Sequence, residues 1–162
     1  MLIEKLKYQT HWTIRKYASD ADFEAGKPFH TAEIDGNLLL NEGIGELLDI
    51  LCGLGTPTAF SNANAYIGVG DSSTAESAAH TGLQASTNKL YKAMQASYPS
   101  RSGQTVTFRA VFTSAEANYA WNEFTIANGN SDAAKNLNRK VSAQGTKAAG
   151  QTWTVDVSVT LA

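Results

Sequence analysis

Cysteine and proline are scarce in this chain of 162 residues, which contains one cysteine and three prolines. A single cysteine excludes an intrachain disulfide framework and any metal site built from several cysteines. Cys52 ends the apolar run of residues 47–52, so we expect it to be a small core residue and not a reactive thiol. A chain of this length can bury a sufficient core as one domain without covalent support.

Charge is also sparse, because Asp, Glu, Lys and Arg make up 17% of the residues and the formal net charge is −2. Such a chain lacks the positive electrostatic potential that attracts nucleic acid or anionic lipid, so we expect neither partner. No apolar run approaches the ~18 residues of a membrane span, and the N-terminus lacks the apolar core of a signal peptide. We therefore expect a soluble protein made in a cytoplasm.

Patterns that carry catalysis are missing as well. His11, His30 and His80 are far apart, and none has a second metal-ligating side chain at a suitable spacing. The sequence contains no G-x-S-x-G nucleophile motif, and the G-x-G at residues 68–70 lacks the third glycine and the helix of a dinucleotide site. We predict no metal, no cofactor and no enzymatic activity.

What the sequence does contain is alternation of apolar and polar residues, which is typical of strands with one buried face. The polar residues 114–118 are short enough to join two such runs, 105–113 and 119–126, as an antiparallel hairpin. Residues 89–97 are compatible with a strand or a helical turn. Further strands are expected at residues 8–17, 31–34, 65–70, 136–143 and 151–161.

Seven to nine short strands, one helix and no alternation of strand with helix indicate an all-β fold, an antiparallel β-sandwich of jelly-roll-like form. Residues 36–162 should form this sandwich. Residues 1–35 differ in composition, with one strand followed by an acidic, turn-like segment. They are interpreted either as part of the sandwich or as an arm that reaches a neighbouring molecule.

The helix is predicted at residues 41–53. The side chain of Asn41 can cap its first turn, and Gly53 can end it in a left-handed conformation. One face is apolar, so we expect this face to lie on the sheets. The residues of that face, which recur at spacings of three and four, are Ile44, Leu47, Leu48 and Leu51.

Glu123 lies between aromatic residues in an apolar setting, and a half-buried carboxylate needs a partner. We predict that Arg109 or Arg139 supplies it. Glu116 and Glu123 could also face each other as an acid and base pair, but ordinary solvated or salt-bridged carboxylates are the better interpretation.

The three tryptophans allow a different function, since exposed tryptophans on a β-sandwich can stack on sugars. Trp121 and Trp153 fall on alternating segments with other apolar residues, which favours their burial. The surroundings of Trp12 in the sequence do not decide whether it is buried or exposed.

The order of short motifs along the chain resembles that of small virion structural proteins of tailed bacteriophages. The motifs that carry the resemblance are WTIRKY at 12–17, GNLLLNEG at 36–43, YIGVG at 66–70, YP at 98–99, TVTF at 105–108, WNEF at 121–124, LNR at 137–139, GTK at 145–147 and WTV at 153–155. The resemblance implies a non-enzymatic β-rich protein that is present in many copies on a virus particle.

Within that class we expect a capsid decoration (cement) protein located in the virion. It would be a homotrimer that binds the major capsid protein on the outer surface of the head. The alternatives are a tail, baseplate or fibre-associated module and, second, a carbohydrate-binding sandwich. Partner contacts are expected from Trp12, Arg15, Tyr17, Phe23 and Phe29. Structural roles are expected for Asn41, Gly53, Arg109, Trp121, Glu123, Arg139 and Trp153.

Overall fold

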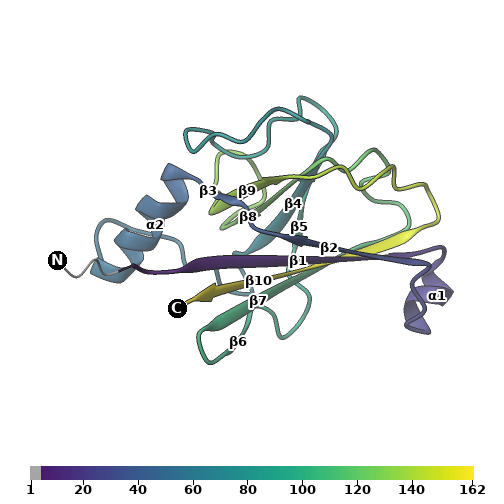
Figure 1. Cartoon of the computed structure of the whole chain (residues 1–162), viewed down its shortest axis with the longest axis horizontal. Coiled ribbons are helices and arrows are strands. Elements are labelled where there is room, and N and C mark those ends of the chain that lie inside the picture. Colours follow the sequence, from purple (N-terminus) through teal and green to yellow (C-terminus); the bar gives the residue numbers. More distant parts are fainter. Residues whose placement is uncertain (1–4) are drawn as a thin grey trace.

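The computed structural model describes residues 5–162 and contains two antiparallel sheets of five strands each, which confirms the all-β sandwich (Figure 1). The first sheet has the order β2 (His30–Asp35), β1 (Tyr8–Tyr17), β10 (Thr152–Leu161), β7 (Thr105–Phe112) and β6 (Ser100–Ser102). The second has the order β3 (Leu38–Leu39), β9 (Asn138–Val141), β8 (Glu123–Ala127), β4 (Tyr66–Gly70) and β5 (Lys89–Ala93).

Strand β1 lies inside the first sheet and pairs with β10 over its whole length, from Tyr8 opposite Leu161 to Tyr17 opposite Thr152. On its other side it pairs with β2. The described part of residues 1–35 therefore belongs to the first sheet of this chain. A short helix, α1 (Asp20–Glu24), occupies the acidic segment that was expected to be a turn.

The predicted hairpin between residues 105–113 and 119–126 is wrong. Strand β7 pairs with β6 and β10 in the first sheet, whereas β8 pairs with β4 and β9 in the second. The chain crosses between the sheets after Phe112, and β8 begins only at Glu123. The crossing buries Trp121 between the layers, where burial of a large aromatic side chain outweighs the continuation of a regular ladder.

Aromatic side chains fill the centre of the core between the two sheets. The ring of Trp121 lies 4.8 Å from that of Phe112 and 4.9 Å from that of Trp153, both edge-on. Trp12 joins the same core and is 0% exposed. The predicted burial of Trp121 and Trp153 is confirmed, and the tertiary structure also buries the third tryptophan.

Helix α2 (Asn41–Cys52) begins one residue away from its predicted cap. Leu40 is the N-cap residue and provides no side-chain hydrogen bond, while Asn41 is already helical and donates its backbone N–H to Ala78 O at 2.8 Å. The prediction that Asn41 caps the helix is thus wrong. Gly53 ends the helix in the left-handed region with φ 65°, as predicted, and donates its N–H to Asp49 O.

The orientation of α2 is the opposite of the predicted one. Its buried residues are Gly43 and Glu46, whereas Leu48 and Leu51 are 54% and 79% exposed. Cys52, expected in the core, is exposed for the same reason. No helix within residues 5–162 is long and apolar enough to cross a membrane.

Polar contacts explain why the helix packs in this way. An added Cβ on Gly43 would lie 2.4 Å from the backbone oxygen of Leu137, so only glycine permits this approach of the helix. Glu46 Oε1 accepts hydrogen bonds from Thr58 N at 2.6 Å and Asn128 Nδ2 at 2.8 Å. The helix is held by backbone proximity and by glutamate hydrogen bonds, which leaves its leucines facing outward.

Candidate functional site

The five residues expected to contact a partner do not form one surface, although Arg15, Tyr17 and Phe23 line a common hollow of about 230 Å³. Trp12 is 0% exposed, so its side chain is not available to a partner, and Tyr17 is only 6% exposed. Phe23 packs edge-on against Tyr17 at 5.3 Å between ring centroids. Phe29, just before β2, is 57% exposed. The burial of Trp12 also removes the observation on which a sugar-binding role for this tryptophan would rest.

Arg15, also expected at a partner contact, joins an ion cluster on the outer face of the first sheet. Asp156 Oδ2 accepts hydrogen bonds from Arg15 Nη1 at 2.8 Å and from Arg109 Nη2 at 2.6 Å. Burial alone would raise the pKa of Asp156, but the hydrogen bonds from the two guanidinium groups outweigh it and hold the pKa below its usual range. This arrangement is a structural brace between β1, β10 and β7.

The half-buried carboxylate predicted at Glu123 is fully buried, and its partner is Arg139. Glu123 Oε2 accepts a hydrogen bond from Arg139 Nε at 2.7 Å, and both side chains are 0% exposed. The prediction of an arginine partner is confirmed for Arg139 and wrong for Arg109, which is bound to Asp156. Glu116 is bound instead to Lys92, so Glu116 and Glu123 do not form an acid and base pair.

The buried pair also holds the long loop of residues 71–88 against the second sheet. Glu123 accepts hydrogen bonds from the backbone N–H groups of Gln84 at 2.9 Å and Ala85 at 2.7 Å. Arg139 Nη1 donates to the backbone oxygen of Thr74 at 2.9 Å. Both ends of a segment with little secondary structure are therefore ordered by one ion pair.

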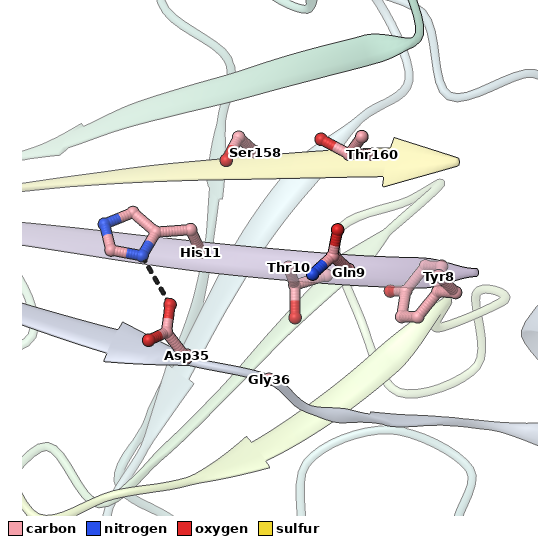
Figure 2. A pocket seen from close by; sticks show the side chains of 8 residues that line it. All are labelled: Tyr8, Gln9, Thr10, His11, Asp35, Gly36, Ser158 and Thr160. Atoms are coloured by element: carbon pink, nitrogen blue, oxygen red, sulfur yellow. Dashed lines mark hydrogen bonds and ion pairs between the residues drawn. The ribbon is translucent and has the colours of Figure 1, made fainter. Parts of the chain in front are cut away.

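A polar hollow of about 530 Å³ opens where β2 leaves the first sheet (Figure 2). Its lining includes His11 and Asp35, whose Nδ1 and Oδ1 atoms are 2.7 Å apart. Strand register places Ser158 directly opposite His11. The residues that line the hollow are Tyr8, Gln9, Thr10, His11, Asp35, Gly36, Ser158 and Thr160.

The histidine in this hollow is not aligned with the serine hydroxyl. Its Nδ1 is hydrogen-bonded to Asp35, and its Nε2 lies 3.8 Å from Glu33 Oε2. No hydrogen bond joins His11 to Ser158 in the described part of the chain, and Figure 2 shows the imidazole turned toward Asp35. The geometry is that of a surface histidine between two carboxylates and not that of a nucleophile triad. Residues 5–162 also contain no cluster of three or more metal-ligating side chains.

The most unusual surface of the molecule lies over α2, at the end where β1 starts and β10 stops (Figure 1). Two adjoining grooves of about 310 and 540 Å³ open there, and both are lined by Leu47, Ile50 and Leu161. Of the nine large apolar side chains that are exposed within residues 5–162, seven line these grooves. We call this the α2 surface. Its exposed members are Leu6, Ile44, Leu47, Leu48, Ile50, Leu51 and Leu161.

The α2 surface is large enough to support specific association. Its seven exposed residues keep between 38% and 79% of their area accessible, the equivalent of between three and four fully exposed side chains. Burial of that area would contribute about 5–11 kcal/mol at about 1.5–3 kcal/mol per side chain. Because association costs an estimated ~4–15 kcal/mol, a stable contact needs a partner that brings comparable apolar area. Contiguous exposed apolar patches of this kind mark interaction sites.

The sequence shows that α2 has an apolar face but does not show whether this face points to the core or to solvent. Helical spacing shows that Ile44, Leu47, Leu48 and Leu51 share a face, and such a face usually packs on a core. The signal that was missed is on the opposite face, where Glu46 follows the adjacent pair Glu42 and Gly43 at spacings of four and three. A glycine flanked by carboxylates indicates close backbone approach and hydrogen bonding.

Lys147 is a buried charge with a testable pH dependence. It is 0% exposed, and its Nζ donates to Thr113 O at 2.8 Å and Asn118 Oδ1 at 2.7 Å. Burial lowers the pKa of its ammonium group from 10.5 to about 8, although Glu116 and Asp20 act in the opposite direction. Between these two values the unfolded chain binds more protons than the folded protein, so the contribution of Lys147 to stability rises with pH.

We expect the free energy of unfolding of the natural chain to increase from pH 8 toward pH 10 relative to a Lys147→Met variant, which lacks the titrating group. Urea denaturation at several pH values measures the difference. Above pH 10 both proteins should become less stable as the pH rises, because burial raises the pKa of Tyr91 and Tyr119. The unfolded chain then releases protons that the folded protein retains. Parallel curves for the two proteins between pH 8 and pH 10 would contradict the assignment.

No protein-family model, no curated protein and no solved structure matches this chain. The fold and the surfaces described above define a small antiparallel β-sandwich with a braced outer sheet face and an exposed apolar end.

Proposed function

We propose that this protein is a structural component of a bacteriophage virion, a capsid decoration protein that binds the outer surface of the head and stabilises contacts between major capsid subunits. It acts as a homotrimer with no cofactor and no catalytic step. The observation that carries the proposal is the α2 surface, where seven large apolar side chains are exposed together on an otherwise well-packed sandwich. Exposed apolar patches of this size mark contacts with protein, membrane or ligand, and we assign this one to protein.

Two further features support a role of this kind. The buried pair of Glu123 and Arg139 holds β8 and β9 to the loop of residues 71–88, and the brace around Asp156 joins β1, β7 and β10. A rigid fold of this kind suits a protein exposed on a particle. Modest contacts suffice in such a protein, because symmetry repeats them many times over one shell and multiplies their effect. Binding to the assembled lattice and not to the free subunit would then stabilise the shell by mass action.

A tail, baseplate or fibre-associated module is the second candidate. The α2 surface favours it equally, because a ring around a tail axis also repeats one contact between copies. The two candidates differ in location on the particle, so a location measurement separates them.

The test is electron microscopy of particles that carry a tagged copy of the protein. The tag belongs between Ala148 and Ala149, which are both exposed in the turn that precedes β10. This turn lies at the end of β10 opposite Leu161, which lines the α2 surface, so the tag leaves that surface free. We expect the label in a regular lattice over the head. Label confined to the tail would overturn the decoration role in favour of the second candidate, and unlabelled particles would contradict both.

A binding assay provides the matched control. Purified protein should sediment with expanded, tailless heads in a fixed ratio to the major capsid protein and should not sediment with unassembled capsid subunits. Binding to neither form would contradict the decoration role even if the protein folds and assembles normally.

A further inference from the structure

We infer that the α2 surface is the site where copies of this chain bind one another, so that the outward leucines of α2 in one copy fill the grooves of the next. This inference deepens the proposed function, on which its biological meaning rests, by naming the surface and its occupant. The oligomer should form in solution without any other virion component.

Shape is the first reason to assign this surface to a second copy. It combines protruding side chains with hollows, since Leu48 and Leu51 stand out from the helix while Tyr8, Leu39 and Leu161 line the grooves beside it. A surface with both features can receive the corresponding features of an identical molecule. A two-fold contact requires one surface that is complementary to itself, and a closed ring requires two complementary parts on each copy, so a surface with both features suits either arrangement.

Area is the second reason. Burial of the exposed apolar residues of one copy would contribute about as much free energy as association costs, so a stable contact needs apolar area from the partner as well. Two copies supply equal apolar areas to the same contact. No other part of the surface of residues 5–162 exposes a comparable apolar area that could cover the α2 surface. The only large apolar side chains exposed outside the grooves within residues 5–162 are Phe29 and Leu54.

Charge is the third reason. Lys5 and Lys7 are exposed on either side of Leu6, which lines the larger groove. Asp49 lies on α2 between Leu48 and Ile50, and residues 28–88 contain no Lys or Arg. The segment that leads into β1 is therefore basic, whereas α2 carries acidic side chains and no Lys or Arg. Each copy presents both signs of charge to its neighbour, which steers the same contact.

The test uses the full chain and the double variant Leu48→Glu/Leu51→Glu, which places two carboxylates in the proposed contact. Both leucines are more than half exposed, so the variant should fold with unchanged circular dichroism. Sedimentation equilibrium should show an oligomer for the natural chain and at least hundredfold weaker association for the variant. The matched control is Phe29→Glu, which alters an exposed apolar side chain before β2 and should leave association unchanged.

Cys52 provides an independent readout, because it is the only cysteine and lies exposed in the last turn of α2. A spin label on Cys52 should show a short, well-defined distance between copies. A monomeric natural chain at all concentrations, an oligomer that the double variant leaves intact, or labels that are far apart would each overturn the inference. The proposed function fails separately, because loss of head binding by a chain that still forms the oligomer contradicts only that function.

Discussion

Replacement of Arg139 by methionine is expected to lower the free energy of unfolding by about 3–5 kcal/mol. Glu123 and Arg139 are both 0% exposed and joined by a hydrogen bond of 2.7 Å. Removal of the guanidinium leaves a buried carboxylate without its counter-charge, and the two backbone N–H groups that it also binds supply only part of the lost stabilisation. Urea denaturation followed by the fluorescence of the buried tryptophans measures the loss.

The control for this effect is Arg101→Met. Arg101 is exposed, and within residues 5–162 its side chain donates only to the backbone oxygen of Gly103, so its replacement should change stability by no more than about 0.5 kcal/mol. Adding Glu123→Gln to Arg139→Met removes the isolated charge and should restore part of the lost stability. Equal losses for Arg139→Met and Arg101→Met would show that the buried pair contributes nothing.

The same variant has a local consequence. Arg139 and Glu123 hold residues 74, 84 and 85 of the loop 71–88 through its backbone. Hydrogen exchange at Gln84 and Ala85 should therefore accelerate more in Arg139→Met than in a variant of equal stability with a change elsewhere in the core. Unchanged relative protection of the loop would mean that other contacts order it.

Gly43→Ala is expected to destabilise the protein by about 1–3 kcal/mol, although alanine is the better helix former. The new Cβ would lie 2.4 to 2.7 Å from three backbone atoms of Leu137, and backbone cannot move aside as a flexible side chain would. The helix must shift away from β9, which strains the hydrogen bonds of Glu42 and Glu46 to the loops below. Chemical denaturation followed by far-ultraviolet circular dichroism measures the effect.

Gly45→Ala is the matched control on the same helix. Gly45 is exposed and an added Cβ would meet nothing within 4 Å, so the gain in helix propensity should stabilise the protein by about 0.5–1 kcal/mol. Changes of opposite sign in the free energy of unfolding for the two substitutions would establish that close packing of Gly43 holds α2 in place. The same sign for both would contradict it.

Several elements could be predicted from the sequence because their signals are local. Alternation of side chains indicated β7 and β10, and β-branched and aromatic residues indicated β1. These strands extend over the expected residues. The end of α2 at Gly53 was equally predictable, because a left-handed closing residue is a property of glycine itself. The need of Glu123 for an arginine also followed from the cost of burying a carboxylate.

Other features depend on residues that meet only in the folded chain. The choice of Arg139 over Arg109 as the partner of Glu123 was decided by which sheet each strand joins, and Arg109 lies in the other sheet. The hollow around His11 and Asp35 likewise exists because β2 and β10 flank β1, a pairing that no local pattern contains. The missing hairpin between β7 and β8 has the same origin.

By itself, the sequence determined a β-sandwich with one amphipathic helix of nearly correct length, because the hydrophobic periodicity and the turn-forming residues depend only on residues that are close in the sequence. Only the tertiary structure decided which way that helix faces. The close approach of Gly43 to Leu137 and the hydrogen bonds of Glu46 outweigh burial of the leucines, and these contacts come from segments 12 to 94 residues distant. The exposed α2 surface, on which the proposed role and the proposed self-contact both depend, is the result.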